Sequence, residues 1–195
     1  MKILAAVPTF ENITPETFKS IYDLDKENHD VDFEYVRGYD CPTARNNIAQ
    51  MALDGGYDYV LMVDSDVVIQ KDALKILTEP LTNIVLGCCP RKNGSDGRIE
   101  IYRQGTFSFT DFYTYDTLPE EKRISIKGGG FACVLIKTSV FRELPFPWFR
   151  YVTYDDGSSL SEDLYFCLKA TEAGYMVEAD TRVRCGHLAR YFQYR

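Results

Sequence analysis

The 195-residue sequence predicts an α/β fold in which helices flank a mostly parallel central sheet. The first observation behind this prediction is that short apolar runs alternate with helical patterns through the first half of the chain, and such alternation implies parallel strand pairing. The second is an ordinary globular composition, with 45% hydrophobic and 26% charged residues. The length suffices to bury one core without disulfides. We therefore expect residues 1–195 to form a single compact domain.

The first half should contain four strands, each a short apolar run that ends at turn residues, over residues 3–7, 31–36, 57–63 and 84–86. Two helices should separate the first three strands. The first helix should begin with Thr14 as its cap and Pro15 at its first position. The second should open at Pro42 and end at Gly55 and Gly56, with an apolar stripe between them.

The second half is less regular, with aromatic and turn-rich segments between its predicted elements. We expect a hairpin or flap from residues 98–103 and 113–115, a strand over residues 131–136 and a closing strand over residues 176–179. A helix should begin at Ser161 and stop at Gly174. The segment of residues 145–160 is aromatic and acidic, and its Trp148 could stack on a flat ligand or pack in the core.

Charge and cysteine content exclude several classes of function. The formal net charge of −7 argues against sequence-independent nucleic-acid binding and against docking on anionic membranes. The six cysteines form no C-x-x-C pair, and the adjacent Cys88 and Cys89 follow an apolar run that predicts burial. We find no secretory signal and no stretch of transmembrane length, and free thiols suit a reducing compartment, so we expect a cytoplasmic protein without an integral membrane segment.

The strongest local motif follows the apolar run of residues 57–63, which leads into Asp64, Ser65 and Asp66. Ligands of parallel sheets bind beyond the carboxyl ends of the strands. Residues two apart on an extended strand point the same way, so both carboxylates should face one site. Oxygen ligands suit Mg²⁺ and Mn²⁺. A solvated turn is the alternative interpretation of this motif.

Two further features have both structural and chemical interpretations. Glu162 and Asp163 follow Ser161 at a helix start, where acidic residues favour the helix dipole, but where Asp163 could also serve as a general base. His187, one of only two histidines, comes just after the last predicted strand. A lone histidine is more often structural than a ligand, although imidazole suits Mn²⁺.

In this order, the motifs resemble those of the GT-A (Rossmann-like) glycosyltransferases, most closely the small family 2-like bacterial and phage-type members. The resemblance extends from Val7 to His187, although the chain is short for the family. The residues that carry it are Pro8 and Thr9 at the end of the first strand, Arg45-Asn46, the D-x-D sequence Asp64-Ser65-Asp66, the Gly-rich run Lys127-Gly128-Gly129-Gly130, the E-D pair Glu162-Asp163, and His187.

The resemblance implies a metal-dependent transferase that moves a sugar from a UDP- or GDP-sugar to the hydroxyl of a glycan or another acceptor. Mn²⁺ or Mg²⁺ would be held by Asp64, Asp66 and His187, and Asp163 would act as the base beside Glu162. Residues 1–88 would bind the nucleotide sugar, and residues 89–195 would face the acceptor. The donor-binding residues would be Pro8, Thr9, Asp40, Arg45, Asn46, Asp64, Ser65, Lys127 and Gly129.

The expected stereochemical outcome is inversion, since Asp163 would activate the acceptor for direct displacement. A retaining transferase is the alternative, because branches with a late metal-binding histidine include retaining enzymes. A sugar-1-phosphate nucleotidylyltransferase is a second alternative, but its Gly-rich, Arg-containing N-terminal signature is missing here. The third is a nucleotide- or glycan-binding module without turnover, against which the intact acidic and histidine set speaks.

Overall fold

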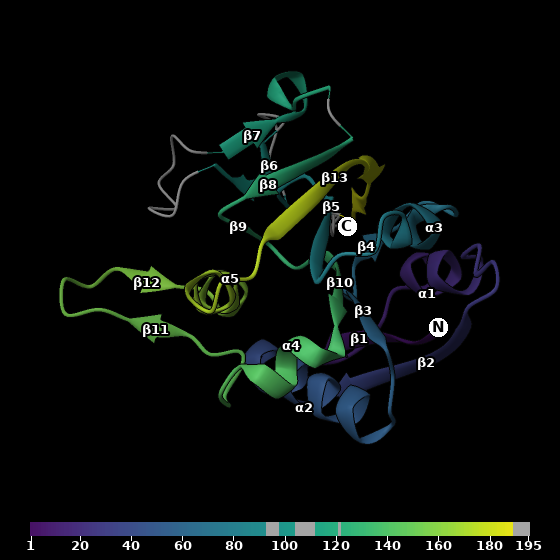
Figure 1. The fold of residues 1–195 in the computed structure, drawn as a ribbon, viewed down its shortest axis with the longest axis horizontal. Helices are drawn as coiled ribbons and strands as arrows, with labels where there is room; N and C mark the ends of the chain where they lie inside the picture. The colour runs from purple at the N-terminus through teal and green to yellow at the C-terminus, as the bar shows by residue number, and fades with distance from the viewer. Residues whose placement is uncertain (93–97, 104–111, 121, 189–195) are drawn as a thin grey trace, which may run out of the picture.

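The computed structural model describes residues 1–92, 98–103, 112–120 and 122–188 (Figure 1). Within these residues, seven strands form a central sheet in the order β2-β1-β3-β10-β5-β13-β8. Their bounds are Lys2–Thr9 for β1, Asp30–Arg37 for β2, Tyr59–Val63 for β3, Ile84–Cys88 for β5, Arg123–Ile126 for β8, Cys133–Lys137 for β10 and Val177–Arg184 for β13. All four strands predicted in the first half are present.

The sheet is mixed, whereas the sequence predicted a mostly parallel one. Strand β1 pairs in parallel with β2 and β3, and β5 pairs in parallel with β13. Strand β10 runs antiparallel to both β3 and β5, and β8 runs antiparallel to β13. The alternation of strands and helices held only for the first half of the chain. Because β10 returns from the second half and enters between β3 and β5, it reverses direction at the centre of the sheet.

Five helices cover the two faces of the sheet in the described residues: α1 (Pro15–Tyr22), α2 (Cys41–Asp54), α3 (Ala73–Thr78), α4 (Thr138–Glu143) and α5 (Glu162–Glu172). Helices α2, α4 and α5 pack on one face and α1 and α3 on the other, as the two buried apolar clusters show. None of these helices has both the length and the apolar character needed to cross a lipid bilayer.

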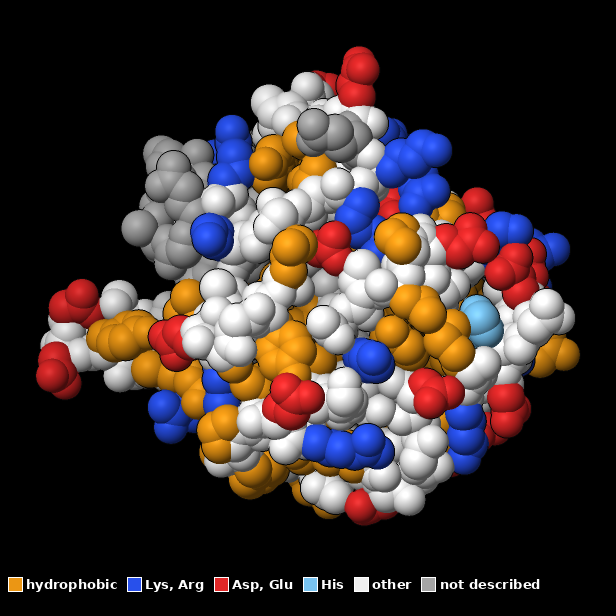
Figure 2. Space-filling model, viewed as in Figure 1, with side chains coloured by type: hydrophobic (Ala, Val, Ile, Leu, Met, Phe, Trp, Pro, Cys, Tyr) orange, Lys and Arg blue, Asp and Glu red, His pale blue; other side chains and the backbone are white. Residues whose placement is uncertain are grey.

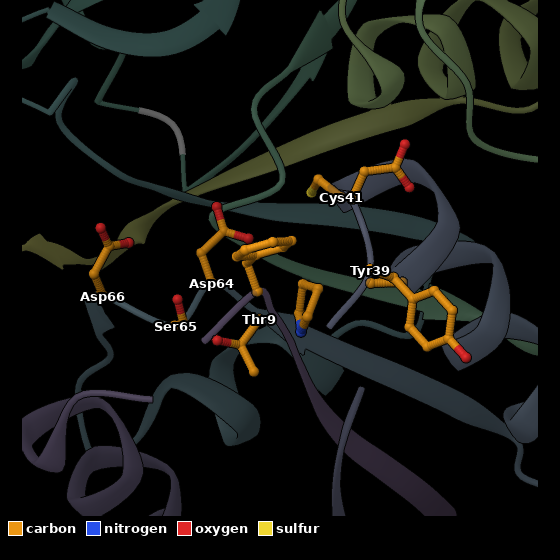
Figure 3. Close-up of a pocket in the computed structure, with 10 residues that line it drawn as sticks. Thr9, Tyr39, Cys41, Asp64, Ser65 and Asp66 are labelled. Carbon is orange, nitrogen blue, oxygen red and sulfur yellow. The ribbon is translucent and has the colours of Figure 1, made fainter. Parts of the chain in front are cut away.

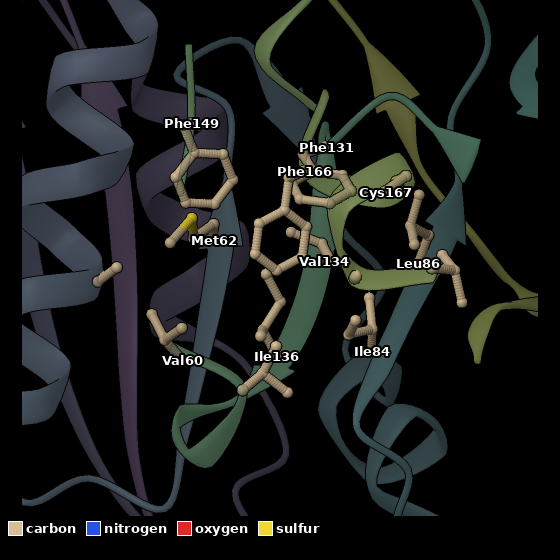
Figure 4. Packing of buried hydrophobic residues seen from close by; sticks show 14 of the residues in the cluster. Val60, Met62, Ile84, Leu86, Phe131, Val134, Ile136, Phe149, Phe166 and Cys167 are labelled. Atoms are coloured by element: carbon tan, nitrogen blue, oxygen red, sulfur yellow. The ribbon is translucent and has the colours of Figure 1, made fainter. Parts of the chain in front are cut away.

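The core beneath α5 is built largely from aromatic rings (Figure 4). Phe149 and Phe166 stack with their ring centroids 4.8 Å apart, and Phe131 packs edge-on against both. All three side chains are buried, and they lie over apolar residues of β3 and β10. Rings of this size supply much of the burial energy of a core. The helix that carries Asp163 is therefore firmly anchored to the sheet.

The predicted helix boundaries are confirmed. Thr14 caps α1 by accepting a hydrogen bond from the Thr17 backbone N–H at 3.2 Å, with Pro15 in the first turn. Helix α2 begins one residue earlier than predicted, at Cys41, with Asp40 as its cap. Helix α5 follows Ser161, and Gly174 follows it with a φ of +89°, a conformation that favours glycine.

Small strand pairs lie around the central sheet. The predicted hairpin is confirmed, because β6 (Arg98–Tyr102) pairs antiparallel with β7 (Phe112–Thr114), and β9 (Gly128–Gly129) pairs with β6 on its other side. A short 3-10 turn, η1 (Tyr115–Thr117), follows β7. The two-residue strands β4 (Val67–Val68) and β14 (Gly186–His187) pair antiparallel, which places His187 opposite Val67. The end of the described chain thus returns to the residues after β3.

Trp148 belongs to the core, which decides between its two interpretations. Its side chain is only 5% exposed, and its indole N–H donates to the carbonyls of Phe141 and Leu144 at 2.9 and 3.0 Å.

The exposed part of this segment is the arm formed by β11 (Val152–Thr153) and β12 (Ser159–Leu160), which projects from the body in Figure 1. Figure 2 shows hydrophobic side chains along this arm and acidic ones at its tip.

Candidate active site

The first cavity lies beyond the carboxyl ends of β1 and β3, where α2 begins (Figure 3). Its volume is about 250 Å³. Ligand sites of open α/β sheets occur at this edge. Figure 3 shows Thr9, Asp64 and Ser65 beside the cavity, with Tyr39 and Cys41 across from them. The lining residues are Pro8, Thr9, Phe10, Tyr39, Asp40, Cys41, Ala44, Asp64, Ser65 and Asp66.

A second cavity of about 250 Å³ adjoins the first, because Asp64 lines both. It brings together predicted residues from three distant parts of the sequence. Its lining consists of Asp64, Cys89, Pro90, Arg91, Lys92, Glu100, Gly130, Phe131, Ala132, Asp163 and His187. All residues that line the first cavity come from the first half of the chain, whereas the second cavity draws on segments from both halves.

Arg45 is buried between the two acidic motifs, with a side chain only 2% exposed. It donates to Asp64 Oδ1 at 2.9 Å and to the carbonyl of Phe131 at 3.2 Å, and its Nε lies 3.3 Å from Glu162 Oε1. Burial raises the pKa of Asp64, and the positive charge of Arg45 opposes that rise. Arg45 therefore fixes the orientation of both carboxylates from below the cavity.

Asp64 and Asp66 stand in a turn rather than on an extended strand. The turn is closed by the Val67 backbone N–H, which donates to the Asp64 carbonyl at 3.1 Å. In Figure 3 the two carboxylates lie apart, on the same side of the turn. Their partners differ accordingly: Asp64 Oδ1 accepts from Arg45, whereas Asp66 faces Lys92 and His187.

His187 is held beside Asp66 by the pairing of β14 with β4. Its Nε2 lies 3.4 Å from Asp66 Oδ1, and its Nδ1 lies 3.0 Å from the carbonyl of Pro90. The Lys92 ammonium pairs with Asp66 Oδ2. The pKa of Asp66 is lowered to about 2, mainly by the hydrogen bond from His187 and to a smaller extent by the hydrogen bond from Lys92. The hydrogen bond to Asp66 is also the largest cause that raises the pKa of His187 to about 10.

Asp66 and His187 offer an oxygen and a nitrogen that could ligate a divalent cation, although the described residues contain no group of three acidic, cysteine or histidine ligands. Carbonyl and carboxylate oxygens can only accept, so Nε2 of His187 donates to Asp66 and would lose that proton on binding a cation, while Nδ1 keeps its proton on the Pro90 carbonyl. Ligating histidines typically donate their second N–H in this way. At the other carboxylate oxygen, Asp66 Oδ2, the Lys92 ammonium already supplies a positive charge.

Asp163 lines the second cavity from the first turn of α5. Its Oδ2 accepts from the Phe131 backbone N–H at 3.3 Å, and its Oδ1 accepts from the Leu164 backbone N–H at 2.7 Å and from the Ser161 hydroxyl. Burial, followed by the negative charge of Glu162, raises the pKa of Asp163 to about 6. A carboxylate with this pKa is suited to take up a proton near neutral pH.

Five predicted donor-binding residues line the first cavity: Pro8, Thr9, Asp40, Asp64 and Ser65. The Thr9 hydroxyl donates to the Asn12 carbonyl at 2.9 Å, which holds the turn after β1. The Asp40 carboxylate accepts from the Thr43 backbone N–H at 3.1 Å as the cap of α2.

Besides Arg45 and Glu162, three predicted residues lie outside both linings. The Asn46 side chain is buried, donates to the carbonyls of Pro42 and Phe149, and accepts from two backbone N–H groups. Lys127 is exposed and lines a separate cavity with Ser125 and Tyr175. Gly129 is buried in β9, where a Cβ would lie 2.7 Å from the backbone oxygen of Glu100. Gly130, its neighbour, lines the second cavity instead.

Among the lining residues that sequence reasoning did not name are Phe10, Lys92 and Glu100. Phe10 and Tyr39, exposed by 69% and 50%, are direct neighbours of the predicted donor-binding residues Thr9 and Asp40. Glu100 alternates with the apolar residues Ile99 and Ile101, a pattern visible in the sequence that places it on the opposite face of the strand. Lys92 carries no comparable signal, because only the folded chain brings it to Asp66.

No protein-family profile and no curated protein matches the chain. Solved structures do match it. A197 from STIV superposes with a TM-score of 0.67 at 17% identity, over 97% of this chain and 87% of that one. GalNAc-T7 with UDP, GalNAc and Mn²⁺ matches with a TM-score of 0.63 at 12% identity, over 98% of this chain and 45% of that one. S. aureus TarS 1-349 in complex with UDP-GlcNAc matches with a TM-score of 0.58 at 16% identity, over 100% of this chain and 62% of that one.

These identities show the fold alone: one domain with a mixed sheet flanked by helices, as in GT-A glycosyltransferases. The chain spans less than two thirds of the GalNAc-T7 and TarS structures that it matches.

Proposed function

We propose that the protein is a metal-dependent glycosyltransferase that moves a sugar from a UDP- or GDP-sugar to an acceptor hydroxyl. The observation that carries this proposal is that His187, Asp64 and Asp163 line one cavity, which adjoins a second at the carboxyl ends of β1 and β3. Two of the three residues proposed to hold the metal, Asp64 and His187, thus face the same space as Asp163, whose pKa is raised, and the third, Asp66, lines the adjoining cavity. The fold shared with structures that contain UDP, UDP-GlcNAc and Mn²⁺ supports it.

The first cavity would hold the nucleoside. Phe10 and Tyr39 offer exposed rings on which a base can stack. Asp40 and Thr9 supply polar atoms at the same wall, where Asp40 could accept hydrogen bonds from the base. Asp64, at the boundary of the two cavities, would face the ribose or a metal-bound water.

The diphosphate would lie near Asp66 and His187, which would hold Mn²⁺ or Mg²⁺ together with Asp64. The metal would neutralise charge that builds on the leaving phosphate. The Lys92 side chain pairs with Asp66, and its ammonium would supply an additional positive charge to the diphosphate. Arg45 would act indirectly, because its guanidinium is buried against Asp64 and Glu162.

Asp163 would take the proton of the acceptor hydroxyl as that oxygen forms its bond to the anomeric carbon. The bond from this carbon to the phosphate oxygen breaks in the same step, and the nucleoside diphosphate leaves. Direct displacement inverts the anomeric centre; a retaining outcome is the alternative. Glu162 would hold the site through Arg45 rather than touch the substrate, since it is only 6% exposed.

The division into a nucleotide-sugar half (residues 1–88) and an acceptor half (residues 89–195) is part of this proposal. Both halves contribute strands to the central sheet, so they would act as two sides of one site. We also infer a cytoplasmic location, which the six free cysteines support because thiols persist in reducing compartments.

A thermal-shift panel tests the proposal. The panel pairs UDP, GDP, ADP and CDP with their sugars, each with and without Mn²⁺. A ligand at 100 times its Kd stabilises the fold by about 2.7 kcal/mol, which raises Tm by roughly 5–10 °C for a chain of this size. We expect such a shift for UDP or GDP only with Mn²⁺. The absence of any nucleotide-dependent shift would reject the proposal, and binding without donor turnover would favour the non-catalytic module.

A further inference from the structure

Glu100 lines the second cavity without a part in the chemistry described so far. Strand β6 buries Ile99 and Ile101 and turns Glu100 to its opposite face. The carboxylate is held from two sides: Arg91 Nε lies 2.6 Å from Oε1, and the Tyr102 hydroxyl donates to Oε2 at 3.2 Å. Its orientation is therefore fixed before any ligand binds.

The side chains of Glu100 and Asp163 converge over Gly130. A Cβ at Gly130 would lie 3.0 Å from the Glu100 Cβ and 3.6 Å from Asp163 Oδ2. The Gly130 backbone N–H also donates to the Glu100 carbonyl at 2.8 Å, which locks β6 against this loop. Any larger residue at position 130 would fill the space between the two carboxyl groups. Glycine here keeps that space open.

Stability alone does not account for Glu100. Its ion pair with Arg91 is partly exposed, with 37% and 32% of the two side chains accessible, and such pairs contribute about 0–1 kcal/mol. Of its two oxygens, Oε1 faces Arg91 and Oε2 accepts from the Tyr102 hydroxyl, and each can accept a further hydrogen bond. A ligand rich in hydrogen-bond donors would use that capacity.

We propose that Glu100 binds hydroxyl groups of the donor's sugar, an inference that rests on the proposed glycosyltransferase function. Carboxylates accept strong, charge-assisted hydrogen bonds, and each oxygen can accept more than one. His187 and Asp64 line the part of the cavity where the diphosphate is expected. Asp163, the proposed base, lines the same cavity. A sugar joined to that diphosphate must occupy the space between them, with Glu100 beside it.

The test compares the affinity of UDP with that of UDP-GlcNAc and UDP-GalNAc by calorimetry with Mn²⁺. We expect Glu100→Ala to weaken binding of the preferred UDP-sugar about tenfold or more and to leave UDP affinity within about twofold. Glu100→Gln keeps the shape but loses the charge, so its loss should be smaller. Glu172→Gln, an exposed change on α5, is the matched control, and Tm is measured for each variant.

Three results would overturn the assignment. An equal loss of UDP and UDP-sugar affinity would indicate a structural role. Unchanged UDP-sugar affinity with a raised acceptor KM would place Glu100 on the acceptor side, and no change in either would remove it from the site. Failure of the proposed function would look different, because the wild-type protein would then bind no nucleotide at all.

Discussion

The buried position of Arg45 predicts a large effect of Arg45→Met on folding. The guanidinium pairs with Asp64 at 2.9 Å and with Glu162 at 3.3 Å, and the Glu162 side chain is only 8% exposed. Removing one partner of a buried ion pair leaves the other charge uncompensated and costs about 3–5 kcal/mol. For a chain of this size, that corresponds to a decrease in Tm of roughly 6–20 °C.

A double-mutant cycle separates this ion pair from simple loss of packing. Urea unfolding, followed by the fluorescence of the single tryptophan, gives the unfolding free energies of Arg45→Met, Glu162→Met and the double variant. Because the double variant removes both charges, its loss should be smaller than the sum by about 1–3 kcal/mol. Arg142→Met, an exposed change, should stay within about 0.5 kcal/mol of wild type. Additive losses, or a loss below 1 kcal/mol for Arg45→Met, would refute the reasoning.

Three further predictions concern the site and the core. Asp163→Asn should lower transfer about 10²-fold or more with normal nucleotide binding, and wild-type transfer should fall as the pH drops below about 6, where the base becomes protonated. Because folding raises the pKa of Asp163, wild-type stability should fall as the pH rises from about 4 to 6, and Asp163→Asn should lack that loss in unfolding measurements at each pH. Trp148→Ala should cost about 3–5 kcal/mol and lower donor and acceptor use together; an increased ratio of hydrolysis to transfer at unchanged Tm would contradict a core role. Lys92→Met should tighten Mn²⁺ binding several-fold in electron paramagnetic resonance titrations, because its ammonium no longer competes for Asp66, and weaker or equal binding would contradict that competition.

Local patterns sufficed to predict β1, β2, β3 and the helices beside them, because apolar runs and caps such as Thr14 act over a few residues. The position of β10 could not be predicted in this way. Its partners β3 and β5 lie far away in the sequence, and no local pattern specifies which strands become neighbours. The mixed character of the sheet follows from β10 and from β8, which runs antiparallel to β13.

In the candidate site, too, local motifs could be predicted from the sequence, whereas contacts between distant segments could not. The motifs around Asp66 and Asp163 were visible in the sequence, but the contact between Asp66 and His187 depends on the pairing of two strands of only two residues each. Arg45 was predicted to contact the donor, and its burial between Asp64 and Glu162 becomes apparent only when both acidic motifs close over it. Composition alone cannot distinguish a cation that binds a ligand from one that supports two carboxylates.

The most direct test of the account is the Mn²⁺ dependence of UDP affinity in His187→Ala. Calorimetric titrations of UDP, with and without Mn²⁺, are compared for wild type, Asp66→Ala and His187→Ala. Asp66 and His187 lie 3.4 Å apart at their nearest side-chain atoms, so a single ion could contact both. We predict that Mn²⁺ strengthens UDP binding to the wild-type protein and has no effect on either variant. A His187→Ala protein that keeps the full Mn²⁺-dependent gain in affinity would contradict the proposed metal site.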